Sequence, residues 1–411
     1  MSNYQWLEQL PSNWTTYSLG HVARVSTGTA DVQDAEPDGH FPFYVRSPHI
    51  LRLDRYTNDT EAVITAGDGN VGDIFHIARG RFAAHQRVYV IEPGSRLEIR
   101  FLAYVMAATF KASLSGNTAK STVESLRRPM LTGFRVPGPP LSAQRIIADY
   151  LDRETSEIGA LVSDLQIALR LREERTQSAI DRTILASSLS HVALKRFGLS
   201  ITAGVSVNAS TYPATECHPG VLKTGSVSKG YFDPHENKAV ENPHEIARLS
   251  TPVTESTIIV NRANTPDLVG SAALVDRQID NLYLSDLLWQ VHVEHADPAY
   301  IAAYMQTRAY RDSIDLIRVG TSASMQKISQ ENFAKIPIPA FPPAQQAAIA
   351  NEVSRARQEF REAADDINRA VTLAKERRAA LITAAVTGQI DVTAKRRPAA
   401  EQLEDDIKEL S

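Results

Sequence analysis

The 411-residue sequence has almost no cysteine and no long apolar run. Its single cysteine, Cys217, excludes a disulfide framework and a cysteine-rich metal site, as is typical of a protein in a reducing cytoplasm. No run approaches the roughly 20 apolar residues of a membrane-spanning helix, and the N-terminal residues lack the basic and apolar regions of a secretory signal. We therefore expect a cytoplasmic protein, whose 43% hydrophobic residues suffice for two or more cores.

Motifs of common catalytic and metal sites are also missing. The sequence has no Gly-x4-Gly-Lys-Ser/Thr phosphate-binding loop, no His-Glu-x-x-His or Cys-x-x-Cys metal motif, and no Asn/Asp-Pro-Pro-Phe/Tyr segment of an amino-methyltransferase. Histidines are scattered singly, and no carboxylate–lysine cluster typical of a nuclease stands out. We therefore predict no catalytic residue, no metal ligand and no cofactor bound by this chain.

One glycine-rich segment imitates a nucleotide-binding motif. Gly67–Gly72 has the pattern Gly-x-Gly-x-x-Gly after an apolar run. A dinucleotide site needs a helix to begin at this point, because the phosphate binds at the helix N-terminus. Residues Asp73–Ile77 are instead typical of a strand. The segment predicts a glycine-rich hairpin turn with positive φ angles.

The sequence also lacks the basic surplus of a typical free-standing DNA-binding protein. Its formal net charge is −4, whereas such proteins usually carry excess Lys and Arg. Any affinity for nucleic acid must therefore come from local patches or from a basic partner subunit.

What the sequence does contain is a duplication. Pro137–Pro140, followed by Gln144, returns as Pro339–Pro342, followed by Gln346, and the match continues into a charged helical stretch. A repeat of about 202 residues is too long for a solenoid or propeller. It predicts two copies of a globular domain plus a long helix, related by a pseudo-twofold axis. Duplex DNA with two half-sites is the commonest partner of such an arrangement.

Local patterns divide each copy into a strand-rich domain and a helix. Short β-branched runs such as Val63–Thr65 and Leu288–Val293 predict strands, and a helix is expected over 97–114. We predict an α+β fold with five segments. They are a first domain (1–140), a central helix (141–189), a second domain (190–341), a C-terminal helix (342–390) and a charged tail (391–411).

Both helical segments carry a seven-residue apolar repeat typical of a coiled coil. The repeats are Leu151, Ile158 and Leu165 in the first helix, and Val353, Phe360, Ile367, Ala374 and Leu381 in the second. We expect two antiparallel helices that pack on each other, each roughly 65 Å long at 1.5 Å per residue. The alternative is two unrelated amphipathic helices, each packed only on its own domain.

An ordered set of segments makes the chain resemble the DNA-specificity subunit of a type I restriction–modification system. The segments include Leu10–Trp14, Tyr44–Ile50, Val221–Val227, Ile258–Gly270 and Leu381–Asp391. The resemblance implies two target-recognition domains that each read half of a bipartite, asymmetric DNA site, with the helices as spacer. It also implies two methyltransferase subunits that methylate adenine with S-adenosylmethionine, and restriction subunits that use ATP and Mg²⁺, so that catalysis and cofactors belong to the partners.

The chemistry for reading bases is available in the loops of both domains. Arg and Lys can contact guanine, Asn and Gln can contact adenine, and Ser and Thr can position phosphates. In the first domain the candidates are Arg46, Ser47, His49, Asn70, His85, Gln86, Arg87, Lys120 and Ser121. In the second domain they are Lys223, Thr224, Ser226, Arg262, Asn264, Thr265, Ser322, Ser324, Gln326 and Lys327. The alternative for each is a solvated loop side chain or a turn former.

Two other classes of function stay open at this point. The chain could be a structural scaffold that reads no DNA, or a fragment of a restriction–methylation enzyme with an unrecognised catalytic site. The missing catalytic motifs count against the enzyme.

Overall fold

The computed structural model describes residues 7, 10–114, 125–185, 190–322 and 325–392. The chain divides into two compact units. The first unit contains residues 1–165 and 368–411, and the second contains residues 166–367. Because each long helix crosses from one unit to the other, the boundary differs from the five predicted segments, which remain predictions.

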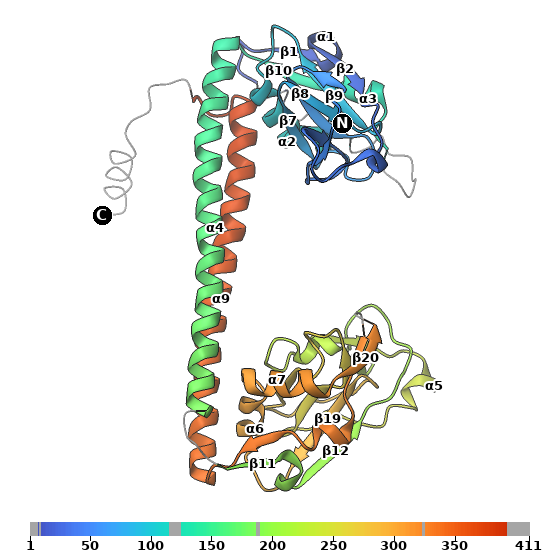
Figure 1. Ribbon diagram of the computed structural model, residues 1–411, viewed down its shortest axis with the longest axis vertical. Coiled ribbons are helices and arrows are strands. Elements are labelled where there is room, and N and C mark those ends of the chain that lie inside the picture. Colours follow the sequence, from blue (N-terminus) through green and yellow to red (C-terminus); the bar gives the residue numbers. More distant parts are fainter. Residues whose placement is uncertain (1–6, 8–9, 115–124, 186–189, 323–324, 393–411) are drawn as a thin grey trace, which may run out of the picture. The chain divides into compact units, whose positions relative to one another are not determined.

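The first unit is built around an antiparallel four-stranded sheet with the strand order β2-β9-β6-β7 (Figure 1). Its strands are β2 (Ala23–Thr27), β9 (Val88–Pro93), β6 (Ala62–Ala66) and β7 (Phe75–Ala78). Strand β6 is buried along its whole length, as its run of small and β-branched residues requires. The strand predicted at Val63–Thr65 is thus confirmed.

Two further sheets complete this unit. One has the order β4-β3-β8-β5, with β4 (Leu51–Leu53), β3 (Phe41–Tyr44), β8 (Arg81–Ala84) and β5 (Asn58–Asp59). The other pairs β1 (Thr15–Ser18) with β10 (Arg135–Gly138). The short helices are α1 (Leu19–Val22) and α3 (Arg128–Thr132). Helix α2 (Ile99–Leu114) packs on the four-stranded sheet and matches the helix expected over 97–114.

The second unit repeats these three sheets. Its four-stranded sheet has the order β12-β19-β15-β17, from β12 (Leu199–Ala203), β19 (Leu288–Val293), β15 (Ile258–Asn261) and β17 (Ala272–Leu274). The other two sheets contain β14 (Asn237–Ala239), β13 (Gly220–Leu222) and β18 (Leu282–Tyr283), and β11 (His191–Ala193) with β22 (Pro337–Pro339). The helices are α5 (Pro243–Ile246), α6 (Pro298–Tyr304), α7 (Arg308–Ile317) and α8 (Gln330–Phe333).

A small additional sheet in the second unit has the order β16-β21-β20. Its strands are β16 (Ala263–Asn264), β21 (Met325–Lys327) and β20 (Val319–Ser322). In the first unit the corresponding pairing is the single bridge between Asp68 and Ser125. Residues 115–124, which precede that bridge, lie outside the described part of the chain.

The duplication is also confirmed by two glutamines at the beginnings of the long helices. Oε1 of Gln144 accepts a hydrogen bond from the backbone N–H of Glu98 at 2.9 Å, just before α2. Oε1 of Gln346 accepts one from the backbone N–H of Asp297 at 2.9 Å, just before α6. Glu98 and Asp297 also cap their helices with their own carboxylates. These four residues therefore align the two copies.

The long helices are α4 (Leu141–Leu185) and α9 (Pro343–Val386). In the second unit, Thr183 bonds to Glu352 and Arg357 bonds to Gln177, so the two helices run antiparallel there. In the first unit, the beginning of α4 and the end of α9 share one hydrophobic core. Helix α9 ends before Gly388, whose φ of +73° fits the predicted helix stop.

The seven-residue repeats of both helices face inward. Buried or half-buried repeat residues are Leu151, Ile158 and Leu165 in α4, and Val353, Phe360, Ile367, Ala374 and Leu381 in α9. The coiled-coil prediction is therefore confirmed, and the alternative of two unrelated amphipathic helices is wrong.

The hairpin predicted at the glycine-rich segment is also present. Gly69 and Gly72 have φ angles of +74° and +81° and connect the antiparallel strands β6 and β7. A strand, and not a helix, follows this turn. In the described ranges, no helix is long and apolar enough to cross a membrane.

Candidate nucleic-acid interface

Three loops of the first unit meet where neighbouring strands end. β3 and β8 run parallel, with Tyr44 opposite Ala84, so the chain leaves both strands at the same edge. β6 ends beside the beginning of β9, with Ala66 opposite Val88. The loops at 45–50, 67–74 and 85–87 therefore lie together, and they carry seven of the nine residues predicted for this domain.

An acidic residue joins two of the predicted arginines. Nη1 of Arg46 lies 2.5 Å from Oδ1 of Asp68, and Nη1 of Arg87 lies 3.3 Å from Oδ2 of the same carboxylate. Both guanidinium groups remain substantially exposed, whereas Asp68 is largely covered. The arrangement places two guanidinium groups side by side at the surface, and each of them can by itself make a bidentate contact with guanine or a phosphate.

His85 and Gln86 have different roles in the same loop. His85 is buried, and its Nδ1 accepts a hydrogen bond from the backbone N–H of Arg87 at 3.1 Å. Burial, and then the charge of Arg46, lowers the pKa of His85 below its usual value. Gln86 is exposed and donates to Oδ2 of Asp31 at 2.9 Å. His85 therefore positions Arg87, while Gln86 remains at the surface.

The other first-domain candidates lie at the rim of this cluster or outside the description. Ser47 accepts from the backbone N–H of His49 at 3.1 Å, and His49 and Asn70 are exposed. Lys120 and Ser121 lie outside the described residues.

The second unit brings corresponding loops together. The backbone N–H of Arg262 donates to the carbonyl of Leu287 at 3.0 Å, just as that of Gly67 donates to Arg87 at 2.9 Å in the first unit. Arg262 is half-buried, and its Nε has no hydrogen-bond partner among the described residues. This Nε is itself buried, so any contact with DNA would come from the terminal amino groups of the guanidinium, at the point that corresponds to the Arg46–Asp68–Arg87 cluster.

Neighbouring candidates surround Arg262. Nδ2 of Asn261, a buried residue that the sequence reasoning missed, donates to the carbonyl of Thr224 at 3.1 Å. Lys223 lies 3.2 Å from Glu236. Ser226 is fully buried, so its hydroxyl lies away from the surface and we assign it a packing role.

The small sheet carries the remaining candidates. Asn264 pairs with Gln326 and Ala263 with Lys327, next to Arg262. Nε2 of Gln326 donates to the carbonyl of Gly320, and Thr265 is exposed. Ser322 lies in β20, but its side chain is not described, and Ser324 lies outside the described residues.

A glycine fixes the position of the central loop in each unit. A Cβ atom on Gly28 would lie 2.1 Å from the carbonyl oxygen of Ala84, and one on Gly204 would lie 2.2 Å from that of Leu284. Only glycine permits this close approach of two backbones. The loops at 85–87 and 285–287 are therefore held in the same way, although only the first was predicted to contain site residues.

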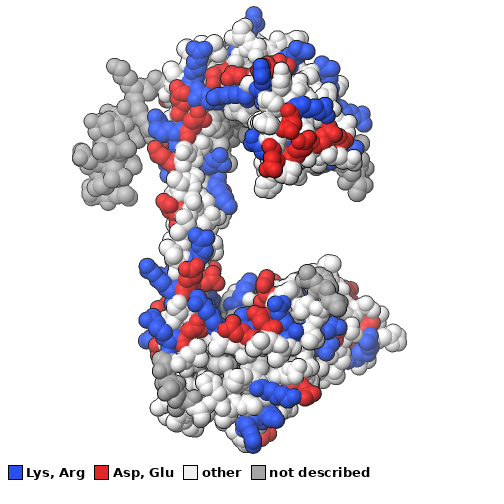
Figure 2. All heavy atoms as spheres, in the orientation of Figure 1, with Lys and Arg blue, Asp and Glu red and all other residues white. Residues whose placement is uncertain are grey.

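Charges of both signs are mixed over the visible face of each unit (Figure 2). Among the residues that the structure describes, no group of three or more His, Cys, Asp or Glu side chains could hold a metal ion. The two loop clusters are thus local polar surfaces.

Comparison with known proteins relates the first of these two clusters to a family. Residues 11–164 match the type I restriction modification DNA specificity domain. The matched segment is therefore similar to a type I DNA specificity domain. It contains all the described first-domain candidates, and the resemblance found in the sequence is thereby confirmed.

Two curated relatives carry the same designation. The type I restriction enzyme EcoDI specificity subunit of Escherichia coli is 32% identical over 171 residues, which are 40% of this chain and 37% of that protein. The EcoEI specificity subunit of Escherichia coli is 32% identical over 126 residues, which are 30% of this chain and 21% of that protein. Each match therefore spans well under half the length of the relative.

The fold extends beyond the specificity domain. A solved chain from work titled "Structural basis underlying complex assembly and conformational transition of the type I R-M system" has a TM-score of 0.66 at 14% identity. The match covers 93% of this chain and 99% of that chain. The likeness shows a shared fold over nearly the whole length.

Proposed function

We propose that this chain is the sequence-reading subunit of a type I restriction–modification complex. One loop cluster reads each half of a bipartite, asymmetric DNA site, and α4 and α9 act as the spacer between halves. The observation that carries this proposal is that equivalent loops, at equivalent strand ends, present polar and basic side chains in both units.

The differences between the clusters support an asymmetric site. The first cluster presents Arg46 and Arg87 on a shared carboxylate, whereas the second presents Arg262 beside the Asn264–Gln326 pair. Arg suits guanine and Asn or Gln suits adenine, so the two clusters should prefer different bases.

We assign no catalysis to this chain. The proposal places methylation of adenine, S-adenosylmethionine, ATP and Mg²⁺ on methyltransferase and restriction subunits that bind this chain in the cytoplasm. The specificity subunits that it resembles support that division of labour. The near-neutral charge is compatible with partner subunits that supply much of the contact with the DNA backbone.

Selection from a pool of random duplexes tests the proposal. The chain, bound to its methyltransferase partners, should enrich one split sequence with two unlike halves. Exchange of residues 190–341 for those of a related chain should change only one half. Enrichment of no sequence would support a non-reading scaffold, and methylation or cleavage by the isolated chain would support an enzyme.

A further inference from the structure

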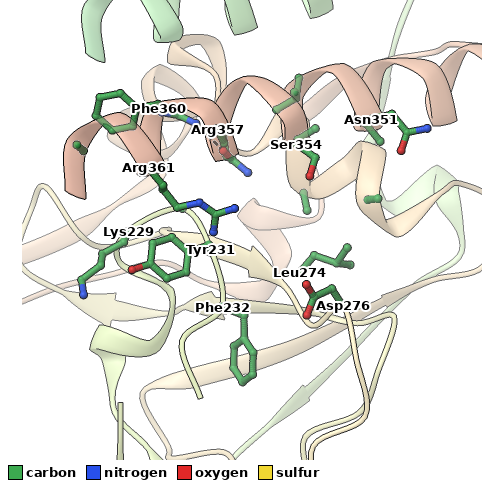
Figure 3. Close-up of a pocket in the computed structure, with 18 of the residues that line it drawn as sticks. Lys229, Tyr231, Phe232, Leu274, Asp276, Asn351, Ser354, Arg357, Phe360 and Arg361 are labelled. Carbon is green, nitrogen blue, oxygen red and sulfur yellow. Dashed lines mark hydrogen bonds between the residues drawn. The ribbon is translucent and has the colours of Figure 1, made fainter. Parts of the chain in front are cut away.

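The second unit contains a cavity of about 560 Å³ between its globular domain and helix α9 (Figure 3). Its walls are the loop 229–232, the end of β17, the helix α6 and one face of α9. This volume lies within the range of about 300–1,000 Å³ that is usual for sites of small organic ligands. The loop clusters assigned to DNA do not use it.

The first unit fills the corresponding space with side chains. With Glu98 aligned to Asp297, Arg100 of α2 corresponds to Ala299 of α6 and Tyr104 corresponds to Ala303. Two long polar side chains of the first copy are thus replaced by methyl groups in the second.

Those long side chains connect α2 to α4 in the first unit. Nη1 of Arg100 donates to Asp149 at 2.8 Å and to Asp152 at 2.7 Å, and the hydroxyl of Tyr104 donates to Asp152 at 2.7 Å. Another hydrogen bond connects Tyr104 with Thr155 at 3.2 Å. The cluster closes the gap between domain and helix.

All five positions differ in the second unit. The helix residues that correspond to Asp149, Asp152 and Thr155 are Asn351, Ser354 and Arg357. The second unit thus has neutral residues in place of the two aspartates and an arginine in place of the threonine. It has alanines in place of the arginine and the tyrosine that bridge the two helices in the first unit. The cavity is the result of these coordinated differences.

Two arginines of the cavity wall have no close acidic partner among the described residues. Arg357 donates to Gln306 at 2.8 Å and to Gln177 at 2.7 Å, and both partners are neutral amides. Burial lowers the pKa of Arg357. Arg361 lies with its guanidinium carbon 4.8 Å from the ring centre of Tyr231. In the described ranges, neither arginine forms an ion pair within 4.0 Å.

The two arginines lie on the same helix above the cavity. Figure 3 shows Arg361 projecting from α9 toward Tyr231, with Arg357 beside it on the helix and Asp276 across the cavity. Lys229 has a long contact of 3.9 Å with Asp233 and lies 6.0 Å from the ring centre of Tyr231. Guanidinium groups match phosphate oxygens in geometry and charge. The carboxylates of Glu173 and Asp181 act on Arg357 only from a distance, so an anion in the cavity would supply a close partner to this half-buried cation.

The remaining wall suits an organic group with hydrogen-bond donors. Leu274, Ala299 and Ala303 provide an apolar surface. The carboxylates of Glu173, Asp276 and Asp365 also line the cavity, and they can accept from hydroxyl or amino groups. A simple inorganic anion would leave these acceptors and most of the volume unused.

We propose that this cavity binds a small phosphorylated organic molecule, with its phosphate on Arg357 and Arg361 and its organic part against α6. This proposal is independent of DNA reading.

Calorimetric titration of the full-length chain tests the site. The probes are AMP, ribose 5-phosphate and inorganic pyrophosphate, with adenosine as the ligand without phosphate. We expect saturable binding of AMP or ribose 5-phosphate, and at least tenfold weaker binding of inorganic pyrophosphate and of adenosine. Ala303→Tyr, which restores the side chain of the first copy, should abolish binding, and Arg361→Ala should weaken it at least tenfold. Arg355→Ala, an exposed arginine on the same helix outside the cavity, should leave it unchanged.

Several outcomes would overturn the proposal. One is that neither AMP nor ribose 5-phosphate binds at millimolar concentration, or that pyrophosphate binds as tightly as either of them. Another is that Ala303→Tyr binds as well as the original chain. A third is that Arg361→Ala weakens binding of random duplex while no small probe binds, because the phosphate would then come from the DNA backbone. If a thermal melt shows that Ala303→Tyr does not fold, the probe affinities of Arg361→Ala and Arg355→Ala are compared instead. Equal affinities of these two variants would overturn the proposal.

Discussion

The carboxylate of Asp68 lies 2.5 Å from the guanidinium group of Arg46 and 3.3 Å from that of Arg87. It partly neutralises the two cations and sets their spacing, before any DNA is bound. If these arginines read bases, as proposed, the carboxylate should suppress contact with arbitrary phosphates and preserve their geometry for base edges.

Asp68→Asn tests this role. The variant should bind random duplex more tightly, with a salt dependence steeper by up to about one phosphate contact, and should discriminate less between sequences. Its free energy of unfolding should change by about 1 kcal/mol or less, because the pairs are partly exposed. Asp59→Asn, which removes an exposed pair with Arg81 at the other end of β8, is the control. Equal salt dependence of all three proteins would contradict the role.

Arg262→Ala should weaken discrimination at one base position in the second half-site by roughly 1–3 kcal/mol. The reason is that Arg262 is the cation at the centre of the second cluster, with its Nε unpaired in the described structure. A competition assay across all single-base variants measures the effect. Arg277→Ala, on an exposed loop, should leave the profile unaltered, and the assignment fails if both variants keep full discrimination.

Each glutamine that aligns the two copies should stabilise its own unit. Gln144→Ala leaves the backbone N–H of Glu98 and the carbonyl of Pro139 without their partner, and Gln346→Ala does the same to Asp297 and Phe341. A loss of about 1–3 kcal/mol is expected for each buried group that becomes unpaired. Chemical denaturation followed in each unit measures it. Gln345→Ala, exposed beside Gln346, should have little effect; equal effects of the two neighbouring variants would refute the role.

His85 predicts a pH dependence of stability in the first unit. Its pKa in the folded chain lies below the value of about 6.5 expected when unfolded. Between these values the unfolded chain binds more protons, so stability is complete above pH 6.5 and falls as the pH drops. His85→Asn retains an acceptor for Arg87 and should flatten this decline. Parallel pH curves for the two proteins would show that His85 does not contribute.

Elements with long, regular patterns could be predicted from the sequence. The strand Leu288–Val293 and the helix that ends at Val386 follow from β-branched runs and a seven-residue repeat, which are local properties. The loop clusters could be predicted only in part from the sequence. Arg46 and Arg87 were predicted because arginines in loops can contact guanine. Asp68 was not predicted, because its role depends on which strands are neighbours.

Other features depend on tertiary packing and have no signature in a single segment. Ser226 has a hydroxyl group that could bind phosphate in an exposed loop. Packing around η4 (Thr224–Val227) buries it instead. The cavity follows from alanines such as Ala303, which look like ordinary helix residues until the first copy shows Tyr104 at the same place. Comparison of the two copies, position by position, is the signal that could have found it.

Long-read methylome sequencing of the source cell, with and without this gene, tests the central claim most directly. If the chain reads DNA for methyltransferase partners, one split adenine-methylation motif should disappear in the deletion strain, and its two unlike halves are the half-sites. A plasmid-borne copy with Asp68→Asn and Arg262→Ala should then restore the motif only with relaxed sequence at the affected positions. A methylome that is identical with and without the gene would contradict the assignment of sequence reading to this chain.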